Sequence, residues 1–114
     1  MPQFAIVLRE DDHSWSRMTK AEQERMYGLY GAWVDGLRAK GAFVSGVSLG
    51  GPSVLLRGEG GSVVEGPWPA GKQVLTGYFV LEAADAAAAV ALARGCPALL
   101  HGESVEVRPV GGIA

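Results

Sequence analysis

Few residues of this chain could carry out chemistry, and His13 is the first candidate. It follows Asp11 and Asp12 directly after an apolar segment. A neighbouring carboxylate can hold an imidazole in the tautomer that a general base needs. We therefore predict that His13 is a catalytic residue at the end of a strand. The alternative is a solvated histidine in an exposed loop.

Glu65 and Arg108 form a second candidate pair, because each lies in or beside a strand-like segment. A guanidinium can bind a carboxylate through two parallel hydrogen bonds. We predict that Arg108 fixes an anionic group of a substrate and that Glu65 moves a proton. The alternative is a structural ion pair that joins the turn at 66–67 to the last strand.

Two aromatic residues, Trp68 and Tyr78, are predicted to bind an aromatic substrate, with the phenol as a hydrogen-bond donor. The alternative is that both belong to the core or to an interface. Trp15 and Trp33 are interpreted as packing residues.

The remaining histidine and the single cysteine receive simpler interpretations. His101 lies in a Leu-Leu-His-Gly segment and is expected to be a surface or interface group. Cys96 has no His or Lys beside it in the sequence, so we expect a small buried hydrophobic residue rather than a nucleophile. With one cysteine and two distant histidines, we predict no metal site and no cofactor.

Composition narrows the class of protein. Hydrophobic residues make up 48% and charged residues 19% of the 114 residues, which predicts one globular domain over residues 1–114. The net charge of −2 gives no electrostatic support for nucleic-acid binding. No apolar run is long enough to span a membrane, and no signal peptide is visible, so we expect a cytoplasmic protein.

The first part of the chain predicts a strand followed by a helix. The apolar run 4–8 is typical of a buried strand, and the charged stretch 9–13 is predicted to be a loop. Thr19 and Glu22 match the capping-box pattern, and apolar residues then recur at helical spacing as far as Gly41. Further elements are predicted at 42–49 (strand), 53–57 and 62–65 (a hairpin around the Gly-rich 58–61), 74–81 (strand), 85–94 (helix) and 104–110 (strand).

This order is β-α-β, a hairpin, then β-α-β, the split pattern of a ferredoxin-like α+β fold. Such a fold has an antiparallel sheet with two helices on one face. The uncovered face needs a partner, and a second copy of the chain is the simplest candidate, so we predict a homodimer.

Several short motifs, taken together, resemble one family. They are Glu-Gly-Pro-Trp at 65–68, Gly-Lys-Gln at 71–73, Thr-Gly-Tyr-Phe at 76–79, Cys-Pro at 96–97, His-Gly at 101–102 and Val-Glu-Val-Arg-Pro at 105–109. In this order the chain resembles the YCII-related family, in the branch named for a DGPF motif. The resemblance implies a dimeric α/β barrel with a pocket between sheet and helices.

The resemblance does not imply one reaction, since most members of the family have no assigned activity. A few related proteins resemble lyases that act on chlorinated aromatic rings. The founding branch is thought to use a His on the first helix and an Asp in an Asp-Pro dipeptide. Here the first predicted helix holds no His, and Cys96-Pro97 stands where that Asp-Pro would fall. Within the DGPF branch, Glu65 replaces the motif Asp, Trp68 replaces Phe, and Gln73 stands where a Glu is common.

Three hypotheses about function follow. The first is a cofactor-free enzyme that performs lyase or proton-transfer chemistry on a small anionic or aromatic substrate. The second is a non-catalytic ligand-binding or accessory dimer, linked to signalling by extracytoplasmic-function sigma factors, beside which members of this branch are often encoded. The third is a purely structural dimer.

Overall fold

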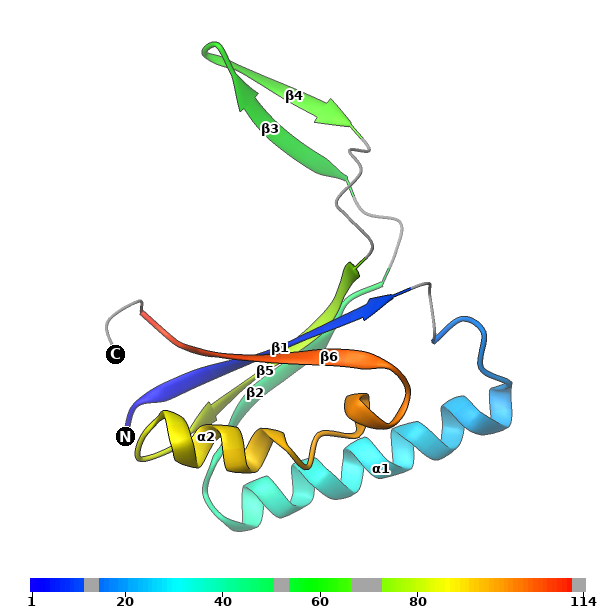
Figure 1. Cartoon of the computed structure of the whole chain (residues 1–114), viewed down its shortest axis with the longest axis vertical. Coiled ribbons are helices and arrows are strands. Elements are labelled where there is room, and N and C mark those ends of the chain that lie inside the picture. The colour runs from blue at the N-terminus through cyan, green and yellow to red at the C-terminus, as the bar shows by residue number, and fades with distance from the viewer. Residues whose placement is uncertain (12–14, 51–53, 67–72, 112–114) are drawn as a thin grey trace.

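A computed structural model of the chain describes residues 1–11, 15–50, 54–66 and 73–111 (Figure 1). Its elements follow the predicted order. They are β1 (Gln3–Asp11), α1 (Lys20–Ala39), β2 (Phe43–Ser48), β3 (Leu55–Glu59), β4 (Ser62–Gly66), β5 (Gln73–Glu82), α2 (Ala86–Ala93), the 3-10 helix η1 (Pro97–Leu100) and β6 (Glu103–Pro109).

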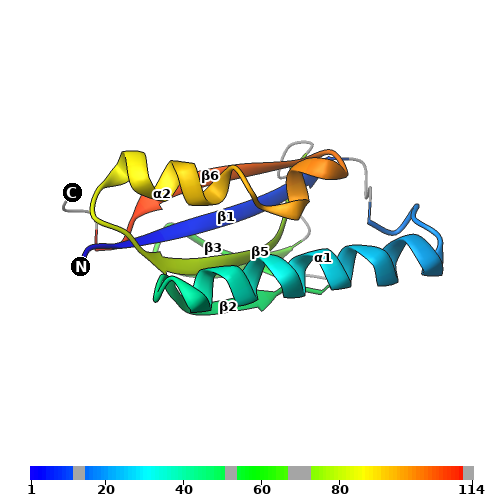
Figure 2. The same ribbon diagram turned by 90° about the horizontal axis from the view of Figure 1, so that it is seen from below.

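Four of the strands form one antiparallel sheet in the order β2-β5-β1-β6. Both α-helices lie on the same side of this sheet, which Figure 2 shows from that side. The order and the one-sided helices confirm the predicted ferredoxin-like α+β fold. We call the covered side of the sheet the helix face and the other side the open face.

Strand β1 shows how the sequence divides between these two faces. Phe4, Ile6 and Leu8 are buried, whereas Ala5 and Val7 between them are only half-buried. Successive side chains of a strand point to opposite faces, so the even-numbered residues of β1 meet the helices. Ile6 and Leu8 belong to the main core cluster, with Leu37 of α1, Leu81 of β5 and Ala93 of α2 among its other members.

Helix α1 begins at the predicted capping box. The Thr19 hydroxyl accepts the Glu22 backbone N–H, and the Glu22 carboxylate accepts the Thr19 backbone N–H. Gly41, just beyond the helix, has a φ of 70°, which a residue without Cβ adopts readily. The buried side of α1 carries Met26 and Leu37, which hold the helix against the sheet.

Strands β3 and β4 form the predicted hairpin as a separate two-stranded sheet. The hairpin extends away from the four-stranded sheet (Figure 1). Its turn places Gly60 and Gly61 at positive φ, 56° and 84°, as the Gly-rich segment predicted. Its side chains are exposed or half-buried, so this hairpin adds nothing to the main core.

The end of β1 corrects one expectation. Residues 9–11, predicted to belong to a loop, continue the strand and pair with 73–75 of β5. Glu10 is 7% exposed on the helix face, and Arg9 forms an ion pair on the open face. A charged segment therefore remains a strand here, because each of these two charges has a hydrogen-bonding partner on its own face.

Candidate functional site

Two of the predicted site residues, His13 and Trp68, lie outside the described residues. The other three lie in three different strands. Glu65 is in β4 of the hairpin, Tyr78 in β5 and Arg108 in β6, and all three side chains are exposed. Glu65 and Arg108 thus belong to separate sheets.

Tyr78 and Arg108 lie on the open face of the four-stranded sheet. Phe79, the next residue after Tyr78, packs against Trp33 of α1 with ring centroids 5.0 Å apart, so Tyr78 points the other way. Arg108 is the register partner of Ala5, and Tyr78 that of Val7, both odd-numbered residues of β1. None of these three residues, Glu65, Tyr78 and Arg108, lines the pocket between α1 and the sheet.

A cavity of about 680 Å³ lies between α1 and the sheet, in the size range of small-molecule sites. Its apolar and aromatic walls come from Leu8, Trp15, Tyr27, Tyr30, Val34, Leu49 and Phe79. Its polar lining includes Glu10, Ser16, Asp35, Arg38, Ser48, Thr76 and Glu103. A mainly apolar hollow with a few convergent polar groups is typical of a ligand site.

Two glycines help to leave this space open. A Cβ on Gly46 would lie 2.5 Å from the ring of Phe79, and a Cβ on Gly77 would lie 2.6 Å from the carbonyl oxygen of Val47. Both positions line the pocket, on the neighbouring strands β2 and β5. Glycine is required at position 46 because the Phe79 ring packs over it, and at position 77 because the backbone of β2 approaches it closely.

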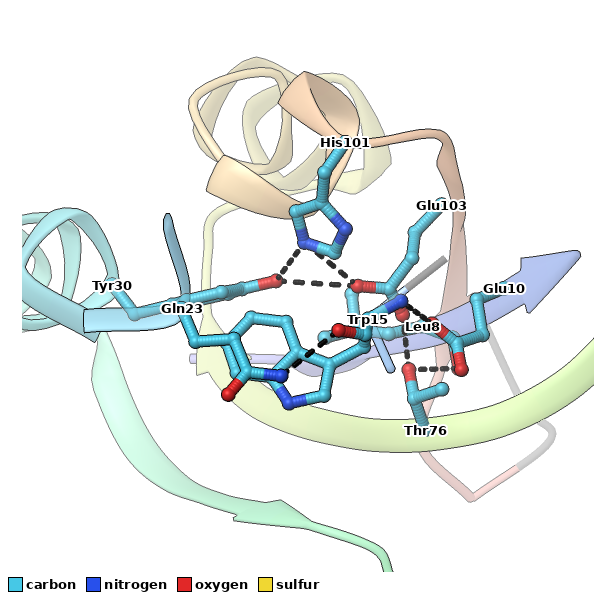
Figure 3. A network of polar contacts seen from close by, with 8 residues as sticks. All are labelled: Leu8, Glu10, Trp15, Gln23, Tyr30, Thr76, His101 and Glu103. Carbon is cyan, nitrogen blue, oxygen red and sulfur yellow. Dashed lines mark hydrogen bonds and ion pairs between the residues drawn. The ribbon is translucent and has the colours of Figure 1, made fainter. Parts of the chain in front are cut away.

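Four polar side chains meet on the helix face; we call Tyr30, Thr76, His101 and Glu103 the Glu103 cluster (Figure 3). Oε2 of Glu103 lies 3.0 Å from Nε2 of His101 and 3.5 Å from the Tyr30 hydroxyl. Oε1 of Glu103 contacts the Thr76 hydroxyl. The Tyr30 hydroxyl also lies 3.3 Å from Nε2 of His101. Glu103 is therefore held by three side chains from three other segments.

A bulge in β5 places the Thr76 hydroxyl in this cluster. Leu8 is the partner of Gly77 and Arg9 that of Leu75, so Thr76 is an extra residue opposite β1. Bulges re-aim side chains in this way beside functional sites. The Thr76 hydroxyl also lies 3.3 Å from the carbonyl oxygen of Leu8, which is the second possible acceptor of its single proton.

His101 and Glu103 are both deeply buried, with 4% and 5% of their side-chain surface exposed. The buried Nδ1 of His101 has no hydrogen-bond partner among the described residues. A proton on Nδ1 would be left unsatisfied, so the proton belongs on Nε2, where Glu103 accepts it. The His101 ring also packs against Trp15, with ring centroids 5.8 Å apart.

This burial corrects the expectation that His101 is a surface group. Pro97 and Ala98 of η1 are buried, and the chain leaves η1 directly at His101. The short helix thus carries His101 beneath Trp15 and Tyr30 rather than out to solvent. The expectation that Cys96 is a small buried residue is confirmed, since it is 2% exposed.

Burial and the charge of Glu103 raise the pKa of the Tyr30 hydroxyl far above its usual value. The phenol therefore stays protonated at neutral pH and serves as a hydrogen-bond donor, not as a base. Burial likewise raises the pKa of the Cys96 thiol to about 11, so the thiol is not a nucleophile at neutral pH.

A second buried carboxylate stands beside the cluster. Glu10 and Glu103 are register partners on β1 and β6, and they are 7% and 9% exposed. Oε2 of Glu10 accepts the backbone N–H of Trp15 at 2.9 Å, and the Gln23 side chain donates to the Trp15 carbonyl at 2.9 Å. These bonds fix the backbone of Trp15, which lines the pocket (Figure 3).

A family model, that of the YCII-related domain, matches residues 3–111. The chain belongs to the YCII-related family. None of the curated proteins compared with the chain matches it. In this YCII-related protein a histidine and a carboxylate do meet, but they come from the end of η1 and from β6 rather than from the first helix.

Two further features are absent from the part of the chain that the structure describes. No three His, Cys, Asp or Glu side chains in the described ranges are arranged to hold a metal ion. Among the same residues, no helix combines the length and hydropathy needed to cross a lipid bilayer.

Proposed function

We propose that this YCII-related protein is a cofactor-free enzyme that moves a proton on a small organic molecule bound between α1 and the sheet. One observation carries the proposal: Glu103 is a buried carboxylate that lines the pocket while His101, Tyr30 and Thr76 hold it. A general base needs a fixed position within hydrogen-bond reach of the proton that it takes.

In the proposed step, a C–H or O–H bond of the bound molecule breaks. The proton goes to a carboxylate oxygen of Glu103, and the electron pair of the bond stays on the substrate. The Nε2–H of His101 holds Oε2 of Glu103 in place, and the proton stays on Glu103 until a later step returns it to the substrate. Where the broken bond is C–H, the electron pair left on carbon can expel a leaving group from the neighbouring atom and form a double bond, which would make the reaction a lyase reaction.

Tyr30 has a supporting part in this proposal. Its raised pKa keeps the phenol protonated, so it donates to Glu103 in the resting site. Tyr30 also lines the pocket, and in the proposed step its hydroxyl turns to donate to an oxygen on which negative charge develops. Thr76, in the bulge, fixes the other carboxylate oxygen.

The proposal places the proton-moving carboxylate at Glu103 rather than at Glu65. His13 stays a predicted second proton carrier, because it lies in the sequence between Glu10 and Trp15, both of which line the pocket. Trp68 stays a predicted aromatic contact. The substrate roles predicted for Arg108 and Tyr78 would require a site on the open face.

The test begins with a thermal-shift panel of small amines, phenols, lactones and carboxylates, since a ligand at about 100 times its Kd adds about 2.7 kcal/mol of stability. Compounds that bind are then incubated with the protein in D₂O, and deuterium incorporation at carbon is followed by NMR. Glu103→Gln should lower the exchange rate by about 100-fold or more while the variant still binds the compound. Glu106→Gln, the same change on the open face of the same strand, should leave the rate unchanged.

Exchange that persists unchanged in Glu103→Gln would exclude Glu103 as the base. Binding without exchange by the wild-type protein would favour the second hypothesis, a ligand-binding or accessory protein. The link to sigma-factor signalling remains a prediction from the resemblance, which a pull-down with the neighbouring sigma factor would test.

We propose further that the protein is a homodimer that buries the open face. Exposed apolar side chains occupy this face at Val47, Leu75 and Tyr78, which are 44%, 43% and 38% exposed. Val7→Lys, at the centre of this face, should convert a dimeric mass in light scattering to a monomeric one. Leu100→Lys, 70% exposed on η1, is the matched control and should leave the mass unchanged. A monomeric wild-type protein at high concentration would refute the dimer.

A further inference from the structure

We propose that the ligand of the pocket is a small organic amine, bound as its ammonium ion between Glu10 and Glu103. This inference rests on the proposed function, because it takes the same pocket as the ligand site. It departs from the anionic alternative of the predicted anionic or aromatic substrate, because the described lining of the pocket carries more carboxylates than basic groups.

The two buried carboxylates are the first argument. Glu10 and Glu103 face each other across β1 and β6, and both line the pocket. Directly opposed residues of an antiparallel pair have Cβ atoms roughly 5 Å apart, and like charges at that separation destabilise each other. A cation between them removes the repulsion, whereas an anion increases it. Each carboxylate can accept about four hydrogen bonds, so an ammonium N–H can add to the bonds already present.

The single basic residue in the described lining, Arg38, does not reverse this balance. Its guanidinium lies 3.9 Å from Asp35 and 4.8 Å from the centre of the Phe43 ring, and its side chain is 63% exposed. It therefore stands at the rim beside a carboxylate of its own. The described lining holds three carboxylates, Glu10, Asp35 and Glu103, against this one guanidinium.

The aromatic wall is an independent argument. Trp15, Tyr27 and Tyr30 line the pocket, and the rings of Trp15 and Tyr27 meet edge to face with centroids 5.2 Å apart. Aromatic ring faces attract an ammonium group, Trp most strongly, and also pack against an apolar substituent. A lining that combines carboxylates with aromatic rings favours a primary amine attached to a compact apolar group.

The experiment compares three probes of similar shape and different charge: 2-phenylethylamine, 2-phenylethanol and phenylacetate. Binding to the wild-type protein is measured by isothermal titration calorimetry at pH 7 and low salt. The amine should bind at least about 10-fold more tightly than the alcohol, the gain expected from one charge-assisted hydrogen bond, and phenylacetate should bind most weakly.

Variants locate the effect. Glu10→Gln should lower the affinity for the amine about 10-fold and leave that for the alcohol unchanged, because only the charge is removed. Glu106→Gln removes the same charge from the open face and should change neither affinity. If Glu10→Gln does not fold, Asp35→Asn at the exposed rim should still lower the affinity for the amine, by about 2-fold to 3-fold.

Binding of the alcohol or of phenylacetate as tight as that of the amine would overturn the amine inference, as would no binding of the amine to the folded protein. These results leave the proton-transfer proposal to be judged by deuterium exchange on whichever compound binds. Conversely, an amine that binds as expected but shows no Glu103-dependent exchange would refute the proposed reaction and keep the ligand class.

Discussion

Strand β6 carries two glutamates three residues apart, Glu103 and Glu106, and they face opposite sides of the sheet. Glu103 is 5% exposed by side chain and is held by His101, Tyr30 and Thr76 on the helix face. Glu106 is 46% exposed and pairs with Arg9 at 2.7 Å on the open face. A glutamate of β6 thus forms the centre of a buried polar cluster on the helix face, and another forms a surface ion pair on the open face.

The main difference between the two carboxylates is how far each is shielded from water. Water screens an exposed ion pair, which contributes at most about 1 kcal/mol. A buried carboxylate has lost its water, and the groups that replace the water cannot be removed without leaving a desolvated charge. The two faces of β6 therefore predict unequal responses to matched substitutions.

The largest difference in stability between the two faces is expected when Glu103 loses His101 and Glu106 loses Arg9. His101→Leu should lower the free energy of unfolding by about 1.5 to 3 kcal/mol, because Glu103 stays buried but loses one of its three hydrogen-bond donors. Arg9→Leu should lower it by less than about 1 kcal/mol. Urea unfolding followed by circular dichroism measures both.

A double substitution sharpens this result. His101→Leu combined with Glu103→Leu removes both polar partners and should recover much of the lost stability, since no unpaired charge remains. Equal losses for His101→Leu and Arg9→Leu would show that the helix face is as well hydrated as the open face.

The second prediction concerns the free energy of unfolding at alkaline pH, where the buried Cys96 thiol and Tyr30 phenol ionise more readily in the unfolded chain than in the folded protein. The Cys96 thiol has a pKa of about 11 when folded, against about 8.5 for an unfolded thiol. Between these values the unfolded chain has released the proton and the folded chain still holds it, so stability falls as the pH rises. Stability is complete below about pH 8.5, and the loss by pH 11 is on the order of 2 to 3 kcal/mol.

Tyr30 adds to this loss above its usual pKa of about 10, since its pKa is also raised by folding. Cys96→Ala is the control: it removes the thiol, and the slope of stability against pH between 9 and 10 should flatten. An unchanged slope in this variant would mean that the Cys96 thiol ionises as readily in the folded protein as in the unfolded chain.

Much of the fold could be predicted because local patterns and tertiary packing agree. The capping box at Thr19 starts α1, and the Gly-rich segment turns the hairpin. The end of β1 was missed because the charges of 9–11 resemble a loop, although Glu10 keeps the inward alternation of Leu8. The local sequence does not show that the Glu10 carboxylate will accept a hydrogen bond on the helix face, because its donor is the backbone of Trp15.

The site was harder to predict for a related reason. The inward alternation of Val105 and Val107 continues back to Glu103, so the sequence held a signal that this glutamate faces the core. No such signal marked His101, because its burial depends on η1, a short turn without periodicity. Tyr30, in turn, was predicted as part of the apolar stripe of α1. Its hydroxyl meets Glu103 only through tertiary packing.

The smallest contrast compares two tyrosines, one on each face, by removing only a hydroxyl. Tyr30→Phe takes a donor from Glu103 and should lower the free energy of unfolding by about 1 to 2 kcal/mol. Tyr78→Phe, on the open face and 38% exposed, should change it by less than about 0.5 kcal/mol. Thermal and urea unfolding of both variants provide the comparison. A loss in Tyr78→Phe that matches the loss in Tyr30→Phe would mean that the open face also satisfies a buried hydroxyl, and the contrast between the two faces would then apply only to charged groups.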